Sequence, residues 1–144
     1  MEDIKQKHYI ESFDVKTTQN KTIQFGDGSD KPTLLVLFTT WCSSCQEAAP
    51  AISKKMAQYK GKINLIGIGR EHNASELEAW ANEQGLAYDL VEDPSRELFN
   101  KFAELHVPRM YLIDTDGSVP YQDVNWHPFM LEDMEEAIEK LLKA

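Results

Sequence analysis

Cysteine is scarce in this sequence, with two among 144 residues, at positions 42 and 45. So few cysteines cannot form the disulfide framework on which small secreted domains depend. A structural zinc site needs about four ligands, and the chain offers no further cysteine and no two histidines at ligand spacing. We therefore expect no metal site, and we also expect no cofactor.

Positive charge is scarce as well, because 15 lysines and arginines stand against 24 aspartates and glutamates, for a net charge of −9. Nucleic acids and anionic membrane surfaces attract basic patches, so we expect neither as a partner. Long apolar runs are also missing, and no stretch approaches the ~20 residues of a membrane-spanning helix. Residues 1–4 are polar and acidic, unlike the start of a secretory signal peptide.

The length of the chain and its 42% hydrophobic content are sufficient for one core of ordinary size. We therefore predict a single domain over residues 1–144. Residues 1–8 are polar and terminal, so we predict that they are flexible.

The most informative stretch is residues 38–45, Phe-Thr-Thr-Trp-Cys-Ser-Ser-Cys. The apolar residues 32–37 before it predict a buried, parallel strand, and apolar residues at helical spacing after it predict a helix. Cys42 then lies near the helix N-terminus, where unpaired N–H groups and the helix dipole favour a thiolate. Cys45, one turn further on, is placed to close a disulfide with it. So short a loop gives little structural stabilisation, so we predict a redox-active dithiol.

Strands and helices are predicted to alternate along the rest of the chain. The predicted strands are residues 9–15, 21–25, 63–69, 87–91, 110–113 and one from 119. Four helices are predicted. The first follows Cys42 and ends at Gly61, and the second begins at a capping box of Ser75 and Glu78. The third covers residues 94–103 after Asp93, and the fourth covers residues 128–142. This order predicts an α/β fold with a mixed sheet and helices on both faces.

Two motifs together resemble a known family. Trp41-Cys-x-x-Cys stands at a strand-to-helix turn, and Val107-Pro108 precedes a predicted strand that is followed by a hairpin turn at Asp116-Gly117. This pattern resembles the thioredoxin fold, and it is most similar to the TlpA/ResA-like branch of thiol-disulfide oxidoreductases. Residues 13–25 match that branch's N-terminal β-hairpin extension, and residues 70–106 match its mid-chain insertion.

The resemblance implies an enzyme that exchanges disulfides with protein substrates. Cys42 would be the nucleophile and Cys45 the resolving thiol. Pro108 would be cis and face the dithiol, the backbone of Val107 would pair with substrate, and Trp41 would contribute an exposed ring for docking. A plain core position is the alternative for Trp41.

The implied partners are protein thiols and disulfides and an upstream thiol-disulfide electron donor, and we expect a monomer. The resemblance favours the cell envelope or periplasm if a leader or anchor has been removed, and the cytoplasm otherwise.

The sequence departs from the family at the acids that usually assist the second thiol. The two family positions hold Val36 and Ala48 here, and Glu47 lies one position off. The residues that we predict to tune the thiolate are Ser43, Ser44, Glu47 and Arg109. We interpret His72, His106 and His127 as ordinary surface or loop residues, with His106 as the one to test because it lies near Pro108.

Two other functions stay open. Thr39-x-x-Cys42 matches part of the peroxiredoxin active-site pattern, but the proline that this pattern requires falls at Leu35. The missing acids are also compatible with a binding or sensor module of thioredoxin fold whose catalysis is weak.

Overall fold

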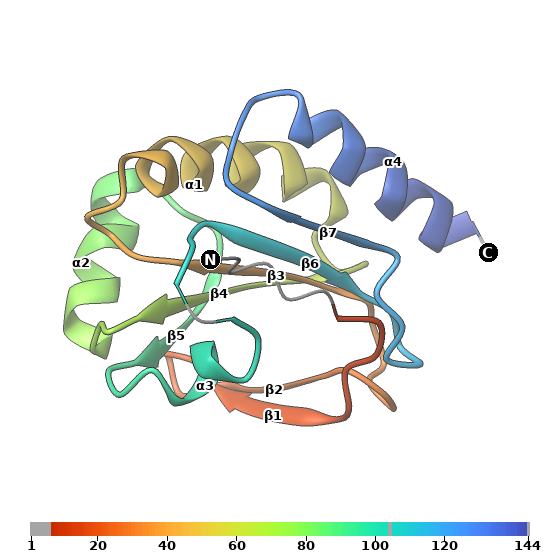
Figure 1. The fold of residues 1–144 in the computed structure, drawn as a ribbon, viewed down its shortest axis with the longest axis horizontal. Coiled ribbons are helices and arrows are strands. Elements are labelled where there is room, and N and C mark those ends of the chain that lie inside the picture. Colours follow the sequence, from red (N-terminus) through yellow and green to blue (C-terminus); the bar gives the residue numbers. More distant parts are fainter. Residues whose placement is uncertain (1–6, 104, 144) are drawn as a thin grey trace.

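The computed structural model describes residues 7–103 and 105–143, and within them a five-stranded mixed sheet forms the centre (Figure 1). Its strand order is β5-β4-β3-β6-β7. The strands are β3 (Thr33–Phe38), β4 (Asn64–Arg70), β5 (Asp89–Asp93), β6 (Arg109–Ile113) and β7 (Tyr121–Val124). The neighbours β3, β4 and β5 are parallel, whereas β6 and β7 run antiparallel to their neighbours. The central strand β3 is buried at every position, as its apolar run predicts.

One face of the sheet is covered by the long helices. These are α1 (Ser43–Met56), α2 (Ala74–Gln84) and α4 (Met130–Lys143). Leu34 and Val36 of β3 point to this face and share a cluster with Ile52 of α1 and Met134 of α4. Pro50 lies inside α1.

The opposite face carries a β-hairpin and a short helix (Figure 1). The hairpin pairs β1 (Phe13–Lys16) with β2 (Thr22–Phe25), and the helix is α3 (Glu97–Asn100). Leu35 and Leu37 alternate with the residues on the first face, so they point to this side and contact the cluster that contains Phe25 and Phe99. The predicted thioredoxin fold, with its hairpin extension and insertion, is confirmed.

The ends of α1 and α2 differ from the prediction. Helix α1 ends at Met56 and continues as a 3₁₀ turn over Ala57–Tyr59, so Gly61 lies beyond both. The capping box of α2 is formed by Asn73 and Glu76, not by Ser75 and Glu78. The end of α2 is as predicted, because Gly85 adopts the left-handed conformation that ends many helices.

Helix α3 is much shorter than the predicted 94–103. Asp93 remains in strand β5, where it pairs with Arg70 of β4, so the helix cannot begin directly behind it. The Asp93 carboxylate still accepts hydrogen bonds from the N–H groups of Leu98 (3.0 Å) and Phe99 (2.8 Å). Asp93 therefore caps the helix from a greater distance along the chain than the sequence predicts.

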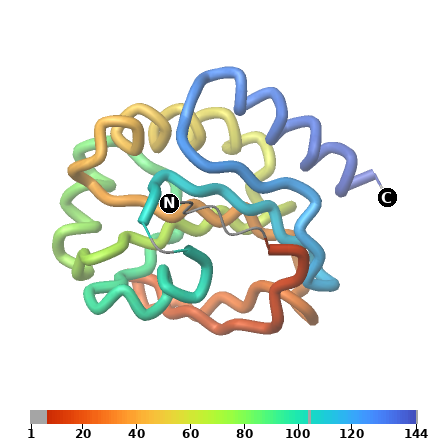
Figure 2. The backbone as a smooth tube through the Cα atoms, in the orientation of Figure 1, coloured from red at the N-terminus to blue at the C-terminus, as the bar shows by residue number. Residues whose placement is uncertain are grey.

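The N-terminal segment lies beside the turn between β6 and β7 (Figure 2). Tyr9 forms an isolated antiparallel bridge with Ser118, and the N–H of Ile10 donates to the carbonyl of Gly117 at 2.7 Å. The predicted flexible segment 1–8 falls mostly on residues 1–6, which lie outside the described residues. Among the described helices, none is both long and apolar enough to cross a membrane.

Candidate functional site

Cys42 is the N-cap residue of α1, directly after the loop that leaves β3. Its backbone is extended (φ −83°, ψ 121°), and its Sγ accepts a hydrogen bond from the N–H of Cys45 at 3.3 Å. The side chain is half-buried. A sulfur in this position faces the unpaired N–H groups and the positive end of the helix dipole, which stabilise negative charge.

Cys45 lies one turn further into the helix and is 1% exposed. It belongs to a cluster with Phe38 of β3 and Leu77 and Trp80 of α2. Burial raises the pKa of the Cys45 thiol well above its usual value, and it outweighs a backbone hydrogen bond with Thr39 that acts in the opposite direction. The two cysteines therefore differ sharply, with an outer sulfur that is accessible and an inner one that is shielded.

The loop before β6 faces this dithiol. The Val107-Pro108 peptide bond is cis, as the resemblance implies. The Cys42 thiol donates to the Val107 carbonyl oxygen, with 3.8 Å between Sγ and O. The structure thus brings Cys42 and Cys45 together with Val107 and Pro108, a second segment that is far from the cysteines in the sequence.

Two buried arginines donate hydrogen bonds to backbone carbonyls of the same loop. Arg70, at the end of β4, donates from Nη1 to the carbonyl of Leu105 at 2.6 Å. Arg109, the first residue of β6, donates from Nε to the carbonyl of His106 at 3.0 Å. Three consecutive carbonyls therefore accept from Arg70, Arg109 and Cys42. Arg109 contacts the loop backbone, and Arg70 is a residue that the sequence did not single out.

Trp41 is 58% exposed, so the core position considered for it from the sequence is wrong. Its ring centroid lies 4.8 Å from that of His72. An exposed aromatic beside an accessible thiol is suited to contact another protein.

The positions of the missing acids are apolar and buried, since Val36 is 3% and Ala48 is 1% exposed. Glu47 is exposed, and its Oε1 accepts from the indole N–H of Trp126 at 3.1 Å. Its carboxylate is therefore directed to the loop before α4. Ser43 and Ser44 occupy the first two positions of α1, where Ser43 is exposed and Ser44 half-buried.

His72 lies in the loop between β4 and α2, but the interpretation of it as an ordinary surface residue is wrong, because the side chain is 2% exposed and contacts the active-site loop. The sequence contains a signal for the position of His72 beside the active-site loop. His72 follows β4 and Thr40 follows β3, and the carboxyl ends of neighbouring parallel strands meet at one edge of a sheet. His106 and His127 are exposed, as expected of surface residues.

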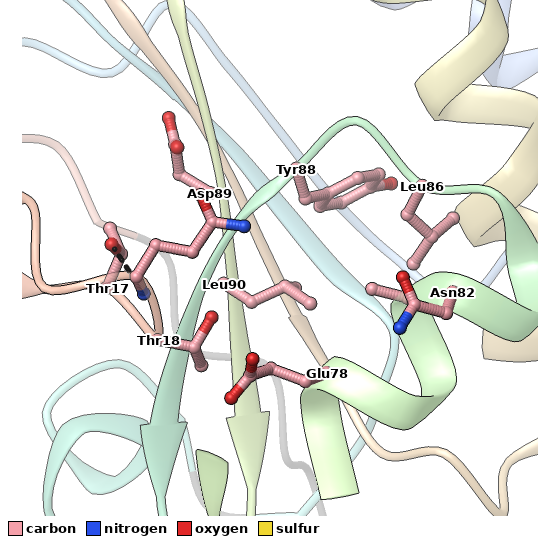
Figure 3. Close-up of a pocket in the computed structure, with 10 residues that line it drawn as sticks. Thr17, Thr18, Glu78, Asn82, Leu86, Tyr88, Asp89 and Leu90 are labelled. Atoms are coloured by element: carbon pink, nitrogen blue, oxygen red, sulfur yellow. Dashed lines mark hydrogen bonds between the residues drawn. The ribbon is translucent and has the colours of Figure 1, made fainter. Parts of the chain in front are cut away.

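A separate cavity of about 130 Å³ lies between the turn after β1 and helix α2 (Figure 3). Thr17, Thr18, Glu78, Asn82 and Asp89 are among the residues that line it. Neither cysteine contributes to its wall, so the dithiol site is distinct from it. Within residues 7–103 and 105–143, no cluster of three or more His, Cys, Asp or Glu side chains is arranged to hold a metal ion.

Comparison with known proteins gives the family. The model of the AhpC/TSA family matches residues 7–122. The chain belongs to the AhpC/TSA family. With its Cys-x-x-Cys pair and cis proline, this AhpC/TSA protein has the thioredoxin-like fold of thiol-disulfide oxidoreductases.

Curated relatives cover most of this AhpC/TSA chain. Thioredoxin-like protein YneN of Bacillus subtilis is 22% identical over 130 residues, which are 88% of this chain and 75% of the relative. Thiol-disulfide oxidoreductase ResA of Bacillus cereus is 24% identical over 133 residues, which are 92% of this chain and 73% of the relative. The resemblance to the ResA-like branch is confirmed.

Solved structures agree on the fold. The solution structure of a protein described as a disulfide isomerase, from Bacteroides thetaiotaomicron, has a TM-score of 0.84 at 25% identity, covering 95% of this chain and 89% of that one. The crystal structure of StoA from Bacillus subtilis has a TM-score of 0.73 at 19% identity, covering 88% and 96%.

Proposed function

We propose that this protein exchanges disulfides with protein substrates through Cys42 as nucleophile and Cys45 as resolving thiol. The observation that carries the proposal is the placement of the Cys42 sulfur at the N-terminus of α1, with Cys45 shielded one turn behind it. The names of the relatives, thiol-disulfide oxidoreductase ResA and thiol:disulfide interchange protein DsbE of Haemophilus influenzae, agree with this chemistry.

The exchange proceeds in two balanced steps. The Cys42 thiolate attacks one sulfur of a substrate disulfide, so a mixed disulfide forms and the other substrate sulfur leaves as a thiolate that takes up a proton. Cys45 then loses its proton and attacks the Cys42 sulfur, which releases the second substrate thiol. The substrate has gained two electrons and two protons, and the Cys42/Cys45 disulfide is reduced again by an upstream dithiol donor.

Trp41, Val107 and Pro108 form the substrate-binding surface in this proposal. An extended substrate segment beside Val107 pairs with its backbone in the manner of an added strand. The Trp41 ring, 58% exposed, packs against apolar side chains that flank the substrate cysteine. A single chain supplies all these groups, so the proposal requires only a monomer.

The second step is the slow one in this proposal. Burial keeps the pKa of Cys45 high, and Val36 and Ala48 supply no carboxylate to accept its proton. Glu47 is directed to Trp126, so water that enters with the substrate takes this proton. Ser43, Ser44 and Arg109 contribute hydrogen bonding and charge near the outer sulfur.

The test is the reduction potential of the Cys42/Cys45 pair, measured by equilibration with glutathione or dithiothreitol. A value near that of thioredoxin, about −270 mV, assigns a reductase, and one near −120 mV assigns a disulfide-forming oxidant. Failure to form a reversible disulfide would overturn the proposal.

Activity assays separate the remaining alternatives. The proposal expects reduction of insulin disulfides by wild type, and none by Cys42→Ser. A binding or sensor module would show a reactive Cys42 without turnover. A peroxidase would consume hydrogen peroxide with dithiothreitol as reductant, which this proposal does not expect.

A further inference from the structure

His72 is a buried titratable side chain that the proposed exchange does not use. It follows β4 and precedes the capping box of α2, and it is 2% exposed. Its imidazole lies against the turn between β3 and α1, where the nucleophile is held. His72 therefore contacts Thr40 and Trp41, the two residues that precede Cys42.

The hydrogen bonding fixes the state of the ring. Nε2 of His72 accepts from the backbone N–H of Thr40 at 3.0 Å. A nitrogen that accepts carries no proton, so the imidazole is neutral and its proton is on Nδ1. The Nδ1 atom lies 3.7 Å from Oε1 of Glu76, the capping-box residue of α2.

Thr40 is held on both sides by side chains. Its N–H is bound by His72, and its carbonyl accepts from the side-chain amide of Gln46 at 2.8 Å. Trp41, the next residue, packs against the His72 ring at a tilt of 52°. Cys42 follows directly, so these contacts set the path by which the chain reaches the helix N-terminus.

We propose that His72 is a positioning residue for disulfide exchange, whose neutral ring holds Thr40 and Trp41 so that the Cys42 sulfur stays at the start of α1. The inference rests on the proposed function, because it names a residue that serves the same site. Gln46 completes the hold from the other side.

Protonation of His72 removes the hold. A charged imidazole carries a proton on each nitrogen, so Nε2–H would face the N–H of Thr40, donor against donor. The charged groups that influence the ring are Glu76 of α2 and Glu71 and Arg70 beside it in the chain. Burial lowers the pKa of His72 and outweighs Glu76, so the ring stays neutral at pH 7.

The test compares His72→Gln with His72→Leu. A glutamine amide oxygen reaches approximately the place of Nε2 and accepts without titrating, whereas leucine is of similar size and cannot accept. His8→Leu is the control, because His8 is exposed. The readouts are the rate of Cys42 alkylation by iodoacetamide from pH 4 to 8 and the rate of insulin reduction at pH 7.

We expect His72→Leu to be slower than wild type at pH 7 by roughly three- to tenfold in both assays, as for loss of one buried hydrogen bond. His72→Gln should keep most of the neutral-pH rate. In acid, the alkylation rates of wild type and His8→Leu should fall more steeply with pH than protonation of one thiol explains, because His72 is protonated as well. The rate of His72→Gln should fall as expected for protonation of one thiol alone.

An acid profile of His72→Gln that matches wild type would overturn the inference, as would a folded His72→Leu with the wild-type rate at pH 7. If His72→Leu does not fold, the His72→Gln profile decides alone. Failure of the proposed function is seen separately, as a wild-type protein without a reversible Cys42/Cys45 disulfide, and the alkylation profiles still test His72 in that case.

Discussion

At the scale of single residues, the two cysteines of one short motif have opposite environments. Cys42 caps a helix and is half-buried, and Cys45 is 1% exposed in an apolar cluster. The roles that we propose for them agree with this difference, because the outer sulfur is accessible to an incoming disulfide and the inner one is shielded.

Alkylation of the reduced protein should therefore label one cysteine. We expect Cys45→Ser to react with iodoacetamide at pH 7.5 as fast as wild type, and Cys42→Ser to react at least ~10-fold more slowly, because burial shields Cys45 and raises the pKa of its thiol well above the usual value. Mass spectrometry of the alkylated protein measures both. Equal labelling of the two variants would contradict the assignment of roles.

The N-cap position of Cys42 makes serine the better inactive variant. Serine is among the preferred N-cap residues, and serine to alanine at such a position costs about 1 kcal/mol. We expect Cys42→Ser to unfold in urea at a higher concentration than Cys42→Ala, with insulin reduction absent in both. The opposite order of unfolding would mean that the Cys42 side chain does not cap α1.

His72 also gives the folded state a dependence on pH. Its pKa is lower in the folded than in the unfolded chain, so the unfolded state binds more protons in acid and the free energy of unfolding falls as the pH drops below about 6.5. The contribution is fully present above that pH. In His72→Gln we expect this part of the acid loss to disappear, as measured by urea unfolding at pH 5 and pH 8.

At the scale of elements, the loop before β6, which faces the dithiol, is held by side chains from two strands. Arg70 of β4 and Arg109 of β6 donate to the carbonyls of Leu105 and His106. Charge-assisted hydrogen bonds of this kind are stronger than neutral ones, so the loop backbone opposite Cys42 is held in place.

Replacement of Arg70 should weaken the attachment of the loop before β6 to strand β4. We expect Arg70→Met to lower the free energy of unfolding by about 1.5–3 kcal/mol, the value of a hydrogen bond to a charged group. The KM for insulin should rise more than kcat falls, because the backbone that we propose to bind substrate is displaced and the sulfurs are not. Lys101→Met is the matched control, since it removes an exposed positive charge near the same loop. An Arg70→Met protein with unchanged KM would contradict this role.

The predicted elements were largely correct, and the errors occurred where tertiary contacts choose between similar local patterns. Asn73 with Glu76 and Ser75 with Glu78 both fit a capping box, and the sequence cannot rank them. Helix α2 begins earlier than predicted because the chain leaves β4 at Glu71, whose N–H donates to the carbonyl of Asp93 in the neighbouring strand. That pairing depends on strand order, which the local pattern does not contain.

The same limit applies to the site. The place of Cys42 and Cys45 at the start of a helix was predicted from one short motif, and the cis form of Pro108 was implied by the resemblance to the family. His72 and Arg70 were missed because their roles depend on β3 and β4 being neighbours. No local spacing marks a histidine as the acceptor for a backbone N–H in another loop.

At the scale of the whole molecule, the N-terminal hairpin is part of the core. One face of the sheet has three long helices among the described residues, whereas the other has the hairpin and the short α3. Phe25 of the hairpin is 1% exposed against Leu35 and Leu37 of β3. The strand that leads to the dithiol thus packs against the N-terminal hairpin.

Shortening the Phe25 side chain should lower the stability of the fold without changing the redox properties of the two cysteines. We expect Phe25→Ala to lower the free energy of unfolding by about 3–5 kcal/mol, the usual range for a buried phenylalanine. The reduction potential of Cys42/Cys45 should stay unchanged at temperatures where the protein is folded. Phe129→Ala is the control, because Phe129 is 75% exposed and its loss should change stability little. A large shift in potential with Phe25→Ala would mean that the hairpin acts on the dithiol directly.

The pairing of Tyr9 with Ser118 has a practical consequence. The turn between β6 and β7 lies at the end of the sheet opposite to Pro108, and the last turn of α4 also extends away from the start of α1 (Figure 1). Both ends of the described chain are thus remote from the reactive sulfur. An electrode or sensor chip coupled near Lys7 or Lys143 would leave Cys42 facing the solution, so electron transfer and substrate capture could be recorded on an oriented layer of protein.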